Sequence, residues 1–212
     1  MDTTLRQDEI GTTIDWSLDG VSARHVDWFW SNMEKAFVLW HPEQHEPMDW
    51  PIPPRPGNPI GAVHHAPQTW DDGRRQDLYI RFEALAEVPD RLRTRIRMDH
   101  AIVVAGLGFA PEAVTAGAPP LGYRLHQWQD RADGSGIEGS STAMGLTKPE
   151  THEDGKVWAA HAATEIGNWA KFLPDLHRLY EVVTDPRRNP FADLSLDGRG
   201  GDARYRHIAA EV

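Results

Sequence analysis

The sequence predicts an α+β fold in which a curved antiparallel sheet is covered by one long C-terminal helix. Segments with alternating apolar and polar residues follow one another between residues 60 and 146. Short turns such as Asp133–Gly136 separate neighbouring segments, which is typical of antiparallel hairpins. One uninterrupted helical pattern then runs from Val157 to Val183, and no other predicted element is long enough to cover the sheet. A sheet wrapped around such a helix with a cavity between them is the helix-grip arrangement.

The N-terminal third is predicted to add a strand, a helix and a loop. Residues Ile10–Trp16 combine threonine, isoleucine and tryptophan before a turn signal, which favours a strand. Ser22 fits the N-cap of a helix that continues to Trp40. Between Pro47 and Pro59 the chain carries six prolines, too many for a helix or a sheet interior, so this stretch is predicted to be a loop near a site.

The middle of the chain is predicted to hold five strands, and the C-terminal region a single long helix. Pro174 is expected to bend that helix rather than end it. Little apolar periodicity follows, so we predict a single domain, 1–184, and a loosely docked tail, 185–212. The strands are predicted at 60–67, 78–84, 95–104, 121–130 and 137–146.

Composition excludes several classes of protein. The 212 residues are 40% hydrophobic and 25% charged, as in an ordinary globular domain. The net charge of −10 disfavours a nucleic-acid or anionic-membrane partner. Neither an apolar stretch of membrane-spanning length nor a secretory signal is recognisable, so we expect a cytoplasmic protein. Because cysteine is absent, a metal site could use only imidazole and carboxylate ligands.

The strongest chemical signal lies on the predicted C-terminal helix. His161 and Glu165 are four residues apart and therefore share a helix face. The same face carries an apolar stripe. If this stripe packs on the sheet, both side chains point inward. A buried glutamate then needs a cation or a hydrogen-bond partner. Two alternatives are open: a rotated stripe that leaves Glu165 solvated, or a simple His161–Glu165 hydrogen bond. The stripe consists of Trp158, Ala162, Trp169, Phe172 and Leu176.

Other histidines are weaker candidates. His41 and His45 are four residues apart in an aromatic segment, although one could merely cap the helix while the other is exposed. His126 shares a strand face with Arg124 and Trp128, a mixture typical of a pocket wall. His64 and His65 are adjacent on a strand, so only one of them can face the cavity. We expect His100 to be a neutral core residue, and His25 and His177 to lie on the surface.

These segments together resemble the 2,4-diacetylphloroglucinol hydrolases and the related phloretin hydrolases. Residues 37–45, Phe-Val-Leu-Trp-His-Pro-Glu-Gln-His, are similar to the family segment aromatic-x-x-W-H-P-x-x-H. Similar pieces follow in the same order, the strand Leu125–Trp128 and the helical pair His161 and Glu165. The resemblance implies a helix-grip fold related to START and Bet v 1 proteins, one zinc ion, and cleavage of the carbon–carbon bond between a phenolic ring and its acyl group.

The resemblance also implies roles for individual residues. His45, His161 and Glu165 match metal ligands of the family, with His41 as the alternative to His45, and His126 matches its catalytic histidine. The family's further ligand, a strand glutamate, has no counterpart here; His65 is taken as its substitute, with Gln68, Asp71 and Asp72 as alternatives. A family tyrosine that holds a substrate hydroxyl is replaced by Phe37. The expected pocket walls are Phe37, Trp40, Trp128, Trp158 and Trp169.

Two functions are therefore open. The first is a zinc-dependent hydrolase of an aromatic ketone, in which His126 donates the proton as an imidazole that titrates near neutrality. The second is a metal-free helix-grip protein, resembling polyketide cyclases, that binds aromatic small molecules without hydrolysing them. Phe37 and the missing glutamate favour the second, and the matching histidines favour the first. The sequence does not decide the oligomeric state, and a homodimer is left open.

Overall fold

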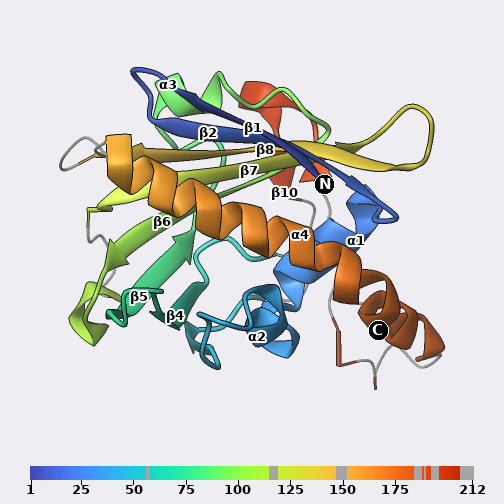
Figure 1. The fold of residues 1–212 in the computed structure, drawn as a ribbon, viewed down its shortest axis with the longest axis horizontal. Helices are drawn as coiled ribbons and strands as arrows, with labels where there is room; N and C mark the ends of the chain where they lie inside the picture. The colour runs from blue at the N-terminus through green and yellow to red at the C-terminus, as the bar shows by residue number, and fades with distance from the viewer. Residues whose placement is uncertain are drawn as a thin grey trace.

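The computed structural model describes residues 1–55, 58–114, 119–146, 152–183, 188, 190–191 and 196–205. Its centre is an eight-stranded antiparallel sheet in the order β1-β2-β8-β7-β6-β5-β4-β3. The long helix α4 (His152–Val182) lies across one face of this sheet (Figure 1). The predicted α+β helix-grip arrangement is confirmed. The strands are β1 (Asp2–Gln7), β2 (Thr12–Asp19), β3 (Asp49–Ile52), β4 (Val63–Thr69), β5 (Arg75–Phe82), β6 (His100–Gly108), β7 (Gly122–Asp130) and β8 (Gly136–Gly145).

Three strands differ most from the sequence prediction, while β4 and β5 are displaced by about three residues. Strand β1 is absent from that prediction, because it is an exposed edge strand whose polar residues do not alternate with apolar ones. Strand β3 lies within the proline-rich loop and forms the opposite edge of the sheet. Strand β6 begins at His100 rather than at residue 95, because the preceding residues form the short helix α3 (Asp90–Arg93) and a turn. The expected hairpin turn at Asp133–Gly136 is present, and Gly134 adopts the positive φ (69°) that such turns favour.

The predicted N-terminal helix is broken into shorter pieces. Helix α1 (Ala23–Ser31) is capped by Ser22, whose hydroxyl accepts a hydrogen bond from the His25 amide. The helix stops at Asn32, whose side chain donates to the Trp28 carbonyl (2.8 Å). After a 3₁₀ turn, η1 (Met33–Lys35), the chain forms the short helix α2 (Phe37–Trp40). This break turns α2 toward α4.

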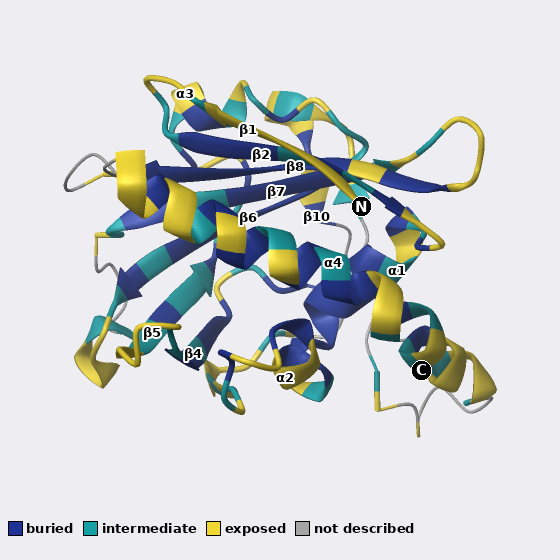
Figure 2. Ribbon diagram, viewed as in Figure 1, coloured by how far each residue is buried: buried dark blue, intermediate teal, exposed yellow. Residues whose placement is uncertain are grey.

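Helix α4 presents its apolar stripe to the sheet, as predicted. Figure 2 shows buried and exposed residues alternating along it, with the buried side toward the strands. Ala162 and Trp169 are fully buried, while Trp158, Phe172 and Leu176 pack at the margin. The helix comes very close to β2 at Gly155, where a Cβ atom would lie 1.9 Å from the Thr12 hydroxyl. Any larger residue at position 155 would push the N-terminal end of α4 away from the sheet.

The interior between α4 and the sheet is rich in aromatic side chains. Trp28, Trp30, Trp128 and Trp169 are each less than 2% exposed. His177 is also buried there, against Trp28, so its expected surface position is wrong. The part of α4 that carries His177 is covered by α1, through contacts with His25 and Trp28. Within the described residues, no helix is long and apolar enough to cross a membrane.

Some of the expected tail is packed rather than loose. Leu196–Asp197 (β9) and Arg204–Tyr205 (β10) form a two-stranded hairpin around a 3₁₀ turn, η4 (Gly200–Asp202). Ala203 and Tyr205 are buried in the core. The predicted domain boundary at residue 184 lies outside the described residues, since only 188, 190–191 and 196–205 are described beyond residue 183.

Candidate metal centre

A tight turn and an edge pairing position His45. The His41 carbonyl accepts hydrogen bonds from the Gln44 and His45 amides (3.1 and 2.8 Å), so the chain makes one turn after α2. The next residues then run along β4, where the Glu46 amide donates to the Pro67 carbonyl (3.0 Å). His45 forms an isolated bridge with Gln68. The backbone around His45 is therefore held on two sides.

Helix α4 supplies the other two members of the site. His161 and Glu165 are both buried on the face that packs toward the sheet, which excludes the solvated alternative for Glu165. One turn further on, the Asn168 side chain donates a hydrogen bond to the Trp40 carbonyl at the end of α2 (2.9 Å). This bond joins α4 to the segment that carries His45.

Three ligand atoms from these residues converge on one point. The Nε2 atoms of His45 and His161 are 3.3 Å apart, and Glu165 Oε1 lies 3.3 Å from the first and 3.2 Å from the second. Atoms bound at about 2.0–2.1 Å to a tetrahedral zinc ion are about 3.3 Å from one another. The spacing of the three atoms therefore matches one face of a zinc coordination tetrahedron.

The hydrogen bonds behind the two imidazoles fix which nitrogen faces the centre. His45 Nδ1 donates to the Phe37 carbonyl (2.9 Å), an atom that can only accept. His161 Nδ1 lies 2.8 Å from Gln44 Oε1. With Nδ1 directed to these acceptors, Nε2 is the nitrogen of each ring that faces Glu165 Oε1 and is available to a cation. Three acceptors facing one another require a proton or a cation between them, and the donor set of two imidazoles and a carboxylate suits zinc.

The ionisation of Glu165 follows from these neighbours. Burial acts to raise the pKa of Glu165, but its interactions with His161 and His45 outweigh burial, and the pKa is lowered. The group is therefore a carboxylate at neutral pH, as a metal ligand must be.

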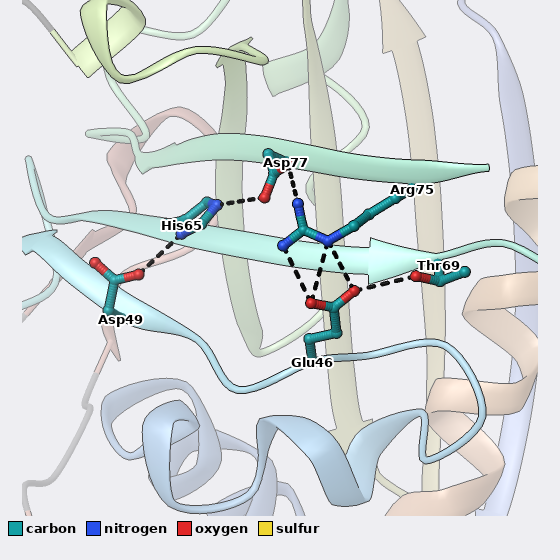
Figure 3. Close-up of polar contacts among 6 residues, drawn as sticks. All are labelled: Glu46, Asp49, His65, Thr69, Arg75 and Asp77. Carbon is teal, nitrogen blue, oxygen red and sulfur yellow. Dashed lines mark hydrogen bonds and ion pairs between the residues drawn. The ribbon is translucent and has the colours of Figure 1, made fainter. Parts of the chain in front are cut away.

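Two other predicted ligands lie outside this group. His41 stacks on the His161 ring (centroids 4.6 Å apart), and its Nδ1 is 3.6 Å from Glu43, so His45 rather than His41 contributes the N-terminal ligand. His65, the expected substitute for the family glutamate, is on the outer face of β4. Figure 3 shows it between Asp49 and Asp77, which its ring nitrogens contact at 2.9 and 3.0 Å. The prediction of His65 as a ligand is therefore wrong.

The alternatives for the missing glutamate also engage other residues. Gln68 is buried and donates to Gln76 (3.0 Å). Asp71 accepts a hydrogen bond from the Gln44 side chain (2.8 Å), and exposed Asp72 pairs with Arg74. In the described residues, His45, His161 and Glu165 alone form a group of metal-binding geometry. A zinc ion held by these three residues would keep one coordination position open, as catalytic zinc sites do.

His126 lies on the inward face of β7 and is completely enclosed. Its Nδ1 is 3.0 Å from the Ser141 hydroxyl, which also accepts a hydrogen bond from the Trp16 indole (3.2 Å). Burial lowers the pKa of His126 to about 4, although the charge of Glu165 partly opposes the shift. The imidazole is thus neutral at neutral pH. The expectation of a proton donor that titrates near neutrality is wrong, because the site excludes the water that would stabilise the cation.

His64, rather than His65, is the β4 histidine that faces the interior. It packs beside Phe37, Trp50 and Phe82, with ring centroids 5.5–6.4 Å away. Burial and the nearby charge of His45 lower its pKa to about 3. Sequence reasoning established that one of the pair must face inward but had no means of choosing between them.

His100 differs from the expected neutral core residue. It pairs with Asp27 (2.9 Å), and its pKa is raised. Burial opposes this shift, but the hydrogen bond and the charge of Asp27 outweigh it. The sequence gives no sign of the pairing, because the two residues are 73 positions apart.

The predicted pocket walls divide into two groups. Phe37 stacks on His45 (centroids 4.1 Å apart), and Trp40 packs edge-on against the same ring (5.7 Å), so both line the candidate metal centre. Trp169 stacks on Trp40 (5.9 Å). Trp128 and Trp158 lie further along the sheet. Trp128 donates to the Ala23 carbonyl (3.2 Å), and Trp158 is only partly buried, under the Arg124 guanidinium.

The two buried neutral histidines predict acid sensitivity. Unfolded histidines titrate near 6.5, whereas His64 and His126 titrate near 3 and 4 when folded. Below pH 6.5 the unfolded state therefore binds protons that the folded state does not. Stability is fully present above that pH and should fall by about 1.4 kcal/mol per pH unit for each histidine, down to its folded pKa. Urea unfolding of the metal-free protein between pH 7.5 and 4 measures this slope. A flat profile would contradict the assignment, and a His126→Gln variant should show a smaller slope than the wild type.

Comparisons with known proteins support the fold and no more. No family model matches the sequence, and no curated protein matches it. Protein Ms6760 from Mycobacterium smegmatis superposes with a TM-score of 0.51 at 15% identity, over 84% of this chain and 99% of that one. Protein NE0264 from Nitrosomonas europaea (TM-score 0.48, 13% identity, 79% of this chain and 97% of its own) and Ara h 8.0201 (0.48, 12%, 77% and 97%) are more distant. The sheet and the long helix α4 make the chain a helix-grip domain, and its interior contains a candidate three-ligand metal centre.

Proposed function

We propose that this protein is a metal-dependent hydrolase that cleaves the carbon–carbon bond between an acyl group and a phenolic ring. The observation that carries the proposal is the convergence of two imidazole nitrogens and one carboxylate oxygen at 3.2–3.3 Å inside an aromatic interior. The resemblance of residues 37–45, 125–128 and 161–165 to the diacetylphloroglucinol hydrolases gives the substrate class.

The residues that would hold zinc are His45, His161 and Glu165. When bound there, zinc supplies a Lewis acid for the acyl carbonyl and lowers the pKa of a water molecule toward about 7. Hydrolysis adds one water across the carbon–carbon bond: the hydroxyl joins the acyl carbon to give a carboxylic acid, and the remaining proton joins the ring carbon. The protein must therefore move a proton from the water to the ring.

A neutral buried imidazole is suited to that transfer. His126 rests without a charge at neutral pH, since burial lowers its pKa to about 4. It can accept the proton from water and, as a strongly acidic imidazolium, return it to the ring carbon. Ser141 contacts Nδ1, which leaves Nε2 as the nitrogen that faces a substrate. In this proposal His126 first accepts a proton and then donates it, whereas the sequence predicts a donor that is already protonated near neutral pH.

The interior also offers hydrogen-bond donors to a substrate. Among the described residues, the indole nitrogens of Trp28, Trp30, Trp40 and Trp169 are buried without a hydrogen-bond partner. Buried donors are nearly always paired, so these groups favour a ligand that carries acceptor oxygens, such as the carbonyl and hydroxyl groups of an acylphenol. The same donors favour the second candidate, a metal-free protein that binds such compounds without cleaving them.

One experiment distinguishes the two candidates. The purified protein is analysed for metal, loaded with zinc if necessary, and incubated with a panel of mono- and diacylated phloroglucinols, with release of the carboxylic acid followed by chromatography. Acid release that is lost with a chelator and restored by zinc supports the hydrolase. The hydrolase proposal would be overturned if the metal-free protein binds acylphenols and neither the metal-free nor the zinc-loaded protein releases acid. That result would favour the binding protein.

A further inference from the structure

We propose that Asp71 and Gln44 are positioning residues that hold His161 in the tautomer required for metal binding. The inference rests on the metal centre of the proposed function, and it concerns a chain of contacts running from the protein surface to Nδ1 of His161. Nothing in the sequence pattern groups these three residues, because they come from the β4–β5 turn, the turn after α2, and α4.

The first link fixes the orientation of an amide. Gln44 is buried, and its Nε2 donates to a carboxylate oxygen of exposed Asp71 (2.8 Å). A carboxylate can only accept hydrogen bonds, so the amide nitrogen of Gln44 must face Asp71. The amide oxygen is thereby turned inward, toward His161.

The second link fixes the imidazole. Gln44 Oε1 lies 2.8 Å from His161 Nδ1, and an amide oxygen can only accept, so the ring proton must reside on Nδ1. The lone pair is then on Nε2, which lies 3.2 Å from Glu165 Oε1. If the amide were reversed, its nitrogen would face Nδ1, favour the tautomer with the proton on Nε2, and place that proton where a metal must bind.

His45 shows why this support is specific to His161. His45 Nδ1 donates to the main-chain carbonyl of Phe37, which cannot turn over. His161 has a rotatable amide in the same place, and that amide needs Asp71 to define its direction. Trp70, the neighbour of Asp71, also lies against the His161 ring (centroids 5.1 Å apart), so the turn between β4 and β5 contacts His161 in two ways.

Metal affinity of the complete, metal-free chain tests the inference through titration with Co²⁺ and Zn²⁺. Gln44→Met keeps the length of the side chain but removes the acceptor, and we expect affinity to fall about 10- to 100-fold, the usual effect of losing a partner behind a metal ligand. Asp71→Asn should give a smaller loss, because an amide at this position lets Gln44 turn over. Asp72→Asn is the matched control, an adjacent exposed aspartate that pairs with Arg74, and should leave affinity unchanged.

An exchange of the two groups gives the decisive variant. In the double variant Gln44→Glu, Asp71→Asn, the asparagine amide can donate to the new carboxylate. That carboxylate can only accept hydrogen bonds, so it also requires the proton of His161 to be on Nδ1. Affinity should return to the wild-type level or exceed it. Nitrogen-15 NMR of the imidazole in the metal-free protein provides a second readout: Nδ1 of His161 should carry a proton in the wild type and the double variant, and in only part of the molecules in Asp71→Asn.

The outcomes separate the two proposals. The positioning role would be overturned if Gln44→Met binds metal with wild-type affinity. It would also be overturned if the double variant binds no more tightly than Gln44→Met although circular dichroism shows an intact fold. A wild-type protein that binds no metal would remove the metal centre and this inference together. If the expected affinities and tautomers are found but no acylphenol is cleaved, the positioning role stands and the hydrolase function falls.

Discussion

Replacing Glu165 with glutamine will weaken metal binding by more than about 100-fold. This loss exceeds the roughly 10- to 100-fold that is usual when a residue behind a metal ligand, rather than the ligand itself, is replaced. The substitution keeps the shape of the side chain but removes the negative charge, and its amide cannot compensate a divalent cation as a carboxylate does. The fold should persist, because α4 retains its apolar contacts through residues such as Trp169 and Leu173. Metal content after dialysis and the thermal unfolding profile measure the two effects separately.

His65→Gln is the matched control for this change. His65 is a ligand in the sequence-based prediction, but it points away from the interior and contacts Asp49 and Asp77. We expect metal binding to be unaffected by its replacement. Full metal occupancy in Glu165→Gln, or loss of metal in His65→Gln, would contradict the assignment of the centre.

Replacing His126 with glutamine will reduce turnover by about 100- to 10,000-fold while the metal remains bound. Glutamine has a similar reach and keeps a polar group beside Ser141, but it cannot carry a proton from water to the ring. The loss should appear mainly in kcat. Metal content, acylphenol binding and acid release are to be measured on the same preparation.

Other results at His126 would have distinct meanings. Loss of metal in His126→Gln would make His126 a ligand and exclude the proton-transfer role. Undiminished turnover would remove it from the mechanism. Ser141→Ala offers a milder comparison, because it removes the contact to Nδ1 but leaves the imidazole in place. A partial loss of turnover is expected there.

Much of this architecture could be predicted from periodicity. Helix α4 and the hairpin that joins β7 and β8 each have a strong local pattern, and the spacing of His161 and Glu165 already placed them on one face of the helix. Strand β1 could not be predicted in the same way, since its polar edge residues are held by pairing with β2 rather than by burial.

The remainder of the site depends on register and on contacts between distant segments. Period-two alternation showed that His64 and His65 face opposite sides, but the pairing of β4 with β3 and β5 decides which side is inside. Gln44 and Asp71 carry no local signal, because their roles exist only after α4 brings His161 beside them. The neutral state of His126 likewise depends on enclosure by the complete fold.

The spacing of the ligands along the chain affects how the protein folds. His45 and His161 are 116 residues apart, and most strands of the sheet lie between them. Closing so long a loop has an entropic cost, which is recovered only when the intervening strands are already paired. The three ligand atoms should therefore come together late in folding. If the proposed metal binds, its binding would report completed folding, because a chain with an unformed sheet or an undocked α4 lacks the centre.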